Sequence, residues 1–170
     1  MNTTIGIDPI EELLKEHKEV VGELEVLETH LRQLEKKATP EKGDEEKLMG
    51  WLTNFEKHIN LHIDKEDNVL FTALEKYIPR HGGPLAVMEM EHRGVESHIE
   101  KFQQGLKKSI LLQPGTLNPF CENGFAMIDL LHAHLGKEEM ILFPMANNVL
   151  STEEKKGISD KFQELNAKVE

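Results

Sequence analysis

The sequence has few of the residues that mark several common protein classes. It contains one cysteine, one tryptophan and one tyrosine among 170 residues, and aromatic residues make up 5% of the chain. Because Cys121 has no intrachain partner, a disulfide-stabilised fold is excluded. The scarcity of aromatic residues also argues against an all-β sandwich or barrel.

Positive charge is scarce as well. The 20 Lys and Arg residues face 31 Asp and Glu residues, which gives a formal net charge of −11. Phosphate backbones repel a chain this acidic, so we expect no nucleic-acid partner. No apolar run approaches the roughly 20 residues needed to cross a bilayer, and the N-terminus lacks the basic and apolar regions of a signal peptide. We therefore expect a cytoplasmic protein with no membrane partner.

Apolar residues recur at helical spacing through most of the chain, interrupted by turns that contain proline and glycine. The pattern predicts two helical hairpins, at about 8–78 and 85–150. A capping box at Ser151 begins one more helix over about 151–168. We therefore predict an all-α fold, an up-and-down four-helix bundle with an additional C-terminal helix, in a single domain over 1–170.

Two residues inside the predicted helices have local consequences. Pro144 falls within the fourth long helix, so we expect a kink or break near Phe143. Cys121 lies near the start of that helix, where the helix dipole lowers the pKa of a thiol, and this makes it a weak redox candidate.

Two short patterns occur twice, in the same order in each half. The pattern Glu-His-(Lys/Arg)-x-Val occupies 16–20 and 91–95, and the pattern His-x-x-Lys-Glu-(Asp/Glu)-x-(Val/Ile)-Leu-Phe occupies 62–71 and 134–143. Each half thus carries one His on its first helix and a His-x-x-x-Glu pair on its second. The repeated ten-residue pattern is a much stronger signal than a single His-x-x-x-Glu pair, which is common in a Glu-rich chain.

The spacing of these residues favours a metal site. Residues four apart on a helix lie on one face, so each His-x-x-x-Glu pair can point at one place. Burying four imidazoles and two carboxylates is costly without a partner, and a cation supplies one. Two ions suit the repeat better than one, with two His and one bridging Glu for each. The candidate ligands are His17, His62, Glu66, His92, His134 and Glu138.

Other interpretations stay open for several residues. Each His-x-x-x-Glu pair could instead be an ordinary side-chain contact on the surface of a long helix. The His of the first and third helices could be hydrogen-bonded core residues. Glu96 and His58 are two further candidate ligands; Glu96 is equally a solvated residue, and His58 fits a supporting or packed position better. The remaining histidines have no repeated counterpart and are interpreted as structural or exposed: His30, His81, His98 and His132.

The types of donor side chain limit which metal ion and which small ligand the site is expected to bind. Imidazole with carboxylate suits iron, zinc or manganese, and the lack of thiolates disfavours copper(I) and iron–sulfur clusters. More His than carboxylate leaves the metal pair more positive, which favours small anionic or reducible ligands such as oxygen, peroxide or nitric oxide. The sequence shows no nucleophile–base pair, so a binding or sensing module is favoured and an enzyme stays the alternative. It indicates no particular protein partner.

The repeated motifs resemble those of the bacterial hemerythrin-like proteins, the His-His-Glu cation-binding domains, up to about Leu150. That resemblance implies two iron ions in a non-haem di-iron centre with an oxo or hydroxo bridge, with Glu66 and Glu138 as bridges and the four His as terminal ligands. The chain differs from the oxygen carriers of that family, which have a second His at the position of Glu96 and an Asp five residues after the last His. These differences argue against reversible oxygen carriage.

Three functional hypotheses follow. The first is a di-iron centre that binds or senses oxygen or a related small ligand. The second is a di-iron centre that acts on peroxide or nitric oxide, or in iron handling and the repair of oxidative damage. The third is a helical bundle stapled by zinc.

Overall fold

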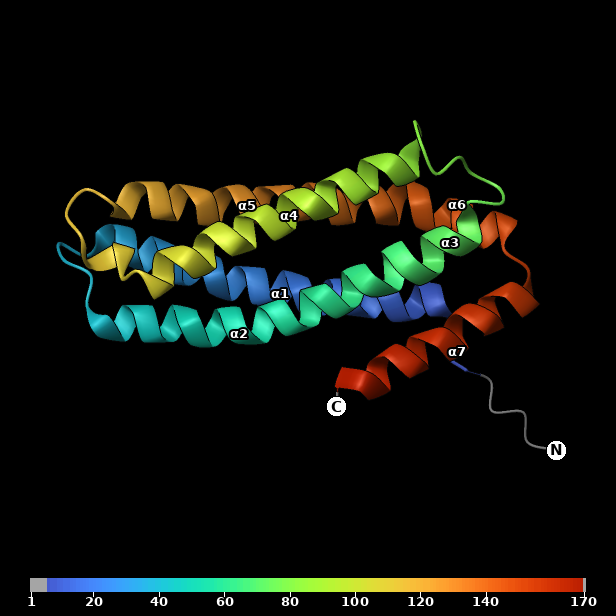
Figure 1. Ribbon diagram of the computed structural model, residues 1–170, viewed down its shortest axis with the longest axis horizontal. Helices are drawn as coiled ribbons and strands as arrows, with labels where there is room; N and C mark the ends of the chain where they lie inside the picture. The colour runs from blue at the N-terminus through green and yellow to red at the C-terminus, as the bar shows by residue number, and fades with distance from the viewer. Residues whose placement is uncertain (1–5, 170) are drawn as a thin grey trace.

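The computed structural model describes residues 6–169, in which four long helices run side by side (Figure 1). The ends of the predicted domain, 1–5 and 170, lie outside this range. The long helices are α1 (Pro9–Lys36), α2 (Lys42–Asp64), α4 (Pro84–Lys107) and α5 (Leu117–Lys137), with a short 3-10 turn η2 (Ile110–Leu112) between the last two. Residues 6–169 contain no strand, and no helix among them is both long and apolar enough to cross a membrane.

A further helix, α7 (Thr152–Val169), turns back along the outside of the bundle (Figure 1). The predicted capping box begins it, because the Glu154 backbone N–H donates to Ser151 Oγ at 3.1 Å and the Ser151 backbone N–H donates to the Glu154 carboxylate at 2.8 Å. Lys155 of α7 forms an ion pair of 3.0 Å with Asp8, which caps the N-terminus of α1. The predicted four-helix bundle with an additional C-terminal helix is thus confirmed.

Two segments of π-helix interrupt the second and fourth long helices. They are η1 (Lys65–Leu70), followed by α3 (Phe71–Leu74), and η3 (Glu138–Leu142), followed by α6 (Phe143–Val149). In each, a Phe backbone N–H donates to the carbonyl five residues earlier, at Glu66 or Glu138. In η1 the neighbouring residues Lys65, Glu66 and Asp67 are all buried, whereas of the equivalent residues at η3 only Glu138 is buried.

The break expected near Phe143 is present as η3, but Pro144 does not explain it alone. Pro144 lies in the first turn of α6, where its missing N–H costs little. The first half forms the same wide turn with Thr72 at the equivalent position. Both π-segments fall inside the repeated ten-residue pattern, so the pattern and its tertiary setting are the shared cause.

The hydrophobic core consists of two clusters separated by a polar layer. One cluster fills the end of the bundle near the α1–α2 turn and includes Leu24, Phe55 and Phe102. The other fills the opposite end, where Phe162 of α7 completes it. The layer between them holds six residues that are 0–2% exposed: His17, His62, Glu66, His92, His134 and Glu138. Each of the four long helical segments of the bundle contributes to this layer where it crosses the middle of the bundle.

Candidate metal centre

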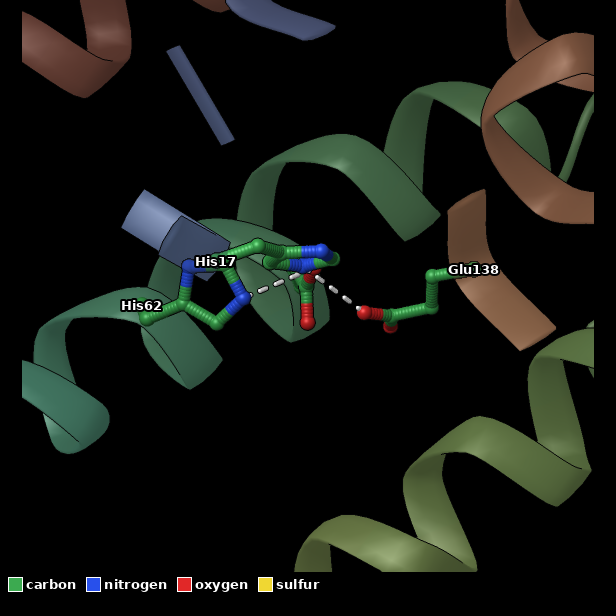
Figure 2. A group of neighbouring side chains, drawn as sticks. His17, His62 and Glu138 are labelled. Atoms are coloured by element: carbon green, nitrogen blue, oxygen red, sulfur yellow. Dashed lines mark ion pairs between the residues drawn. The ribbon is translucent and has the colours of Figure 1, made fainter. Parts of the chain in front are cut away.

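The six candidate ligands converge on one place inside the bundle. They form two groups of four in which all donor atoms lie within 4.8 Å of one another. Both groups contain Glu66 and Glu138; one adds His17 and His62, and the other adds the remaining pair. Figure 2 shows the imidazoles of the first group and the Glu138 carboxylate pointing toward one another from different helices. We call the two groups position A (with His17 and His62) and position B (with His92 and His134).

Glu66 lies between the two positions. Its Oε1 is 3.2 Å from His62 Nε2 and 3.9 Å from His17 Nε2, both in position A. Its Oε2 is 3.1 Å from His92 Nε2 in position B. One carboxylate oxygen therefore faces each position.

Glu138 has the complementary arrangement. Its Oε2 is 3.2 Å from His17 Nε2 in position A. Its Oε1 is 3.2 Å from His134 Nε2 and 4.0 Å from His92 Nε2 in position B. The two positions are thus joined by two carboxylates that approach from opposite halves of the sequence repeat.

The other ring nitrogen of each His contacts a carboxylate that the sequence analysis did not assign. His62 Nδ1 lies 2.7 Å from Glu16, and His134 Nδ1 lies 2.9 Å from Glu91. These two acceptors are the Glu of the repeated Glu-His pattern, so each half orients its own His-x-x-x-Glu pair in the same way. Their presence in both copies of the pattern was the signal that could have identified them.

His17 and His92 are oriented by the opposite half of the chain. His17 Nδ1 lies 2.9 Å from Glu139 Oε1, and His92 Nδ1 lies 2.7 Å from Asp67 Oδ1. These acceptors are the second acidic residue of the repeated ten-residue pattern. Carboxylates in this position fix the ring orientation and the tautomer of a metal-binding His.

The repeated Lys supports the same network. Lys65 is 1% exposed; its ammonium donates to Glu12 at 2.9 Å and to Glu16, and lies over the Phe162 ring of α7. Lys137 forms the equivalent ion pair with Glu91. The Lys and the two acidic residues of the repeated ten-residue pattern therefore have defined contacts around the centre in both halves.

The inner atoms of the cluster are left without partners. Because each Nδ1 faces a carboxylate, it donates its hydrogen outward, and Nε2 is the ring nitrogen that faces the centre. The Nε2 atoms of His17 and His62 and all four carboxylate oxygens of Glu66 and Glu138 have no hydrogen-bond partner among the described residues. His92 Nε2 and His134 Nε2 face each other at 3.0 Å. Buried lone pairs that converge in this way fit cations between them.

The charges of the cluster also favour a cation. Burial opposes protonation of His17, but Glu138 and Glu66 outweigh it and raise its pKa to about 9. Burial likewise opposes protonation of His92, and Asp67 and Glu66 raise its pKa to about 9. Burial disfavours the charged form of Glu66, yet its His neighbours hold the pKa well below the ordinary value. The centre therefore attracts positive charge, whether a proton or a metal ion.

The two further candidate ligands lie outside the cluster. Glu96 is exposed and forms an ion pair of 2.7 Å with Arg93. His58 is 46% exposed and contacts Glu23 at 2.7 Å. Among residues 6–169, neither belongs to the two groups that converge on the centre.

Cys121 differs from the sequence expectation. Its side chain is buried, and burial raises the pKa of the thiol to about 11, with a further increase from Glu35. The expected lowering by the helix start is therefore wrong, because desolvation of the thiolate outweighs the helix dipole.

Comparison with known proteins agrees with this geometry. Residues 8–146 match the hemerythrin HHE cation binding domain. The iron-sulfur cluster repair protein YtfE of Salmonella typhimurium (strain LT2) is 29% identical over 103 residues, which cover 58% of this chain and 46% of that protein. The protein of the same name from Salmonella schwarzengrund is 28% identical over the same length. The chain thus spans about half the length of these curated relatives.

Proposed function

The chain belongs to the hemerythrin HHE cation-binding family, and from this premise we propose that its single domain holds a non-haem di-iron centre that binds or senses oxygen or a related small ligand. The ligands in this proposal are His17, His62, Glu66, His92, His134 and Glu138. The observation that carries it is the pair of carboxylates, each of which directs one oxygen to position A and the other to position B.

The number of protein donors gives zinc and iron different roles at this centre. Each position offers two imidazole nitrogens and two carboxylate oxygens. Four such donors complete the tetrahedron of a structural zinc site, which would make zinc a staple for the bundle. Iron, and also manganese, accepts more than four ligands with this donor set. Iron bound here would supply a redox-active pair of ions with open coordination positions for a small ligand.

Burial restricts what can reach the centre. All six ligands are at most 2% exposed, and Phe143 and Phe71 pack against the rings of His17 and His92. A ligand must therefore be of the size of oxygen, nitric oxide, peroxide or a small anion. The carboxylates at Nδ1 orient the imidazoles with Nε2 inward, and a bound metal ion takes the place of the proton that the raised pKa values of His17 and His92 would otherwise keep there.

A second function within the same proposal is iron handling or the repair of oxidative damage. The support for it is the name of the two relatives, iron-sulfur cluster repair protein, together with their similarity over 58% of this chain. Turnover of peroxide or nitric oxide belongs to this second function. Because the chain spans 46% of those relatives, residues outside the shared region could carry part of their activity.

Iron loading tests the proposal directly. Anaerobic reconstitution is expected to saturate at two iron ions per chain, and oxygen or azide should then produce a charge-transfer band. Replacing the exposed residue in Glu96→Gln serves as a control and should retain both ions. Saturation at one ion, or a preference for zinc with no spectral response to oxygen or azide, would contradict the di-iron proposal. Steady-state consumption of peroxide or nitric oxide would favour the second function over binding.

A further inference from the structure

The carboxylates that orient His17 and His92 differ in their surroundings. Asp67, which accepts from His92, has a side chain that is 10% exposed. Arg93 donates to its second oxygen at 2.9 Å, and Arg80 donates to its backbone carbonyl at 2.9 Å. Glu139, which accepts from His17, is 47% exposed. Within the described part of the chain, Glu139 forms no ion pair with a Lys or Arg.

The acceptors of the other two histidines are each paired with a lysine, which is 1% exposed behind position A and 43% exposed behind position B. Glu16, behind His62, is paired with the buried Lys65. Glu91, behind His134, is paired with Lys137. Both acceptors are thus held by a cation, as Asp67 is. Glu139 is the exception among the four, and it supports a ligand of position A.

This difference bears on how firmly each position holds its ion. A carboxylate that a cation holds in place, away from water, keeps its hydrogen bond to the imidazole and fixes the ring. An exposed, uncompensated glutamate exchanges that hydrogen bond with water and retains its side-chain freedom. Loss of such a supporting partner costs 10–100-fold in metal affinity in typical sites.

We propose that the two ion positions are inequivalent, and that position A, built on His17 and His62, releases its ion faster than position B, built on His92 and His134. Asp67 and Arg93 are positioning residues that hold His92, whereas Glu139 holds His17 only weakly. This inference rests on the proposed dinuclear centre and adds which half of it is labile. The exchangeable position would be the one at which a metal is first lost and last loaded.

Zinc release to a chromophoric chelator tests the inference without any catalytic assay. The decisive comparison is between His17→Ala, which leaves position B intact, and His92→Ala, which leaves position A intact. The ion remaining in His17→Ala should dissociate about 10-fold or more slowly than the ion remaining in His92→Ala. Equal rates, or the reverse order, would overturn the proposal. In the wild type, release of fewer than two zinc ions would instead refute the dinuclear centre itself.

A second pair of variants keeps all six ligands and covers the case in which an alanine variant holds no ion. Asp67→Asn should accelerate zinc release from position B by about 10–100-fold. Glu139→Gln should change the rate of zinc release by less than about threefold. Arg93→Gln, which removes the cation and leaves Asp67 in place, should accelerate release in the same direction. Arg32→Gln is the matched control, because Arg32 pairs with Glu28 on the exposed face of α1. A larger effect of Glu139→Gln than of Asp67→Asn would overturn the proposal.

Discussion

Removal of the metal should destabilise the bundle at neutral pH, and this is the most direct test of the buried centre. Six ligands are buried in a layer that separates two apolar clusters. A cation that binds only the folded state stabilises it by mass action. At 100 times the dissociation constant this contribution is about 2.7 kcal/mol, which for 170 residues corresponds to about 5–11 °C in melting temperature.

The pH dependence of this effect has a definite sign. In the metal-free protein the pKa values of His17 and His92 are raised to about 9 from 6.5. Protonation of such groups stabilises the fold fully below pH 6.5, and this contribution is lost as the pH rises through 9. The melting temperature of the metal-free protein should therefore fall between pH 6.5 and pH 9. The metal-loaded protein should not show this fall, because the ion replaces the protons.

Differential scanning fluorimetry of loaded and chelated protein over pH 5–9 measures both effects. The difference between the two samples should be large at pH 7.5 and above. It should be small at pH 5, where protons compete with the metal for the imidazoles. If protein shown to carry metal had an unchanged melting temperature after chelation at pH 7.5, the placement of the ligands in the buried layer would be refuted. A rise in the stability of metal-free protein from pH 6.5 to 9 would refute the charge argument.

Three further predictions concern single side chains. Glu138→Ala should lose the metal pair while His17→Ala keeps at least one ion, because the Glu faces both positions; equal retention by metal analysis would contradict the bridging role. Gly124→Ala should lower the free energy of unfolding by about 1–3 kcal/mol through overpacking, because the added Cβ would lie 2.5 Å from a buried leucine of α1. Urea unfolding measures this, and Gly22→Ala is the control, because its Cβ would have no other atom within 4 Å. Cys121, with a thiol pKa of about 11, should react with a disulfide reagent at pH 8 only after unfolding, and rapid labelling of the native protein would show that the side chain is accessible.

Much of the fold could be predicted from the sequence because the relevant signals are local. Asp8 and Ser151 cap helices as their sequence positions indicate, and the apolar period marks the four long helices. The candidate ligands were identifiable because the repeat presents them twice, and the structure brings all six together. The repeat also contained the supporting carboxylates, but the sequence alone does not show which His ring nitrogen each carboxylate contacts.

The parts that sequence reasoning missed depend on contacts between the halves. Helical periodicity assumes a constant turn, so it placed one continuous helix where η1 separates α2 from α3. The pairing of His17 with Glu139 spans most of the chain, and a helix-by-helix interpretation cannot anticipate it. Glu96 lies about one turn after the buried His92, yet it is exposed and forms an ion pair with Arg93.

Each of the two π-turns carries one of the two carboxylates of the polar layer. In a regular α-helix, consecutive residues point in directions 100° apart. Within the π-turn of the first half, Glu66 faces the centre while Lys65 contacts Glu16 and Asp67 contacts His92. A turn of this kind is less favourable than α-helix, and it occurs twice, at the same place in the repeat. The inner atoms of that layer have no hydrogen-bond partner among the described residues, and protons or metal ions bound between them would offset part of this cost.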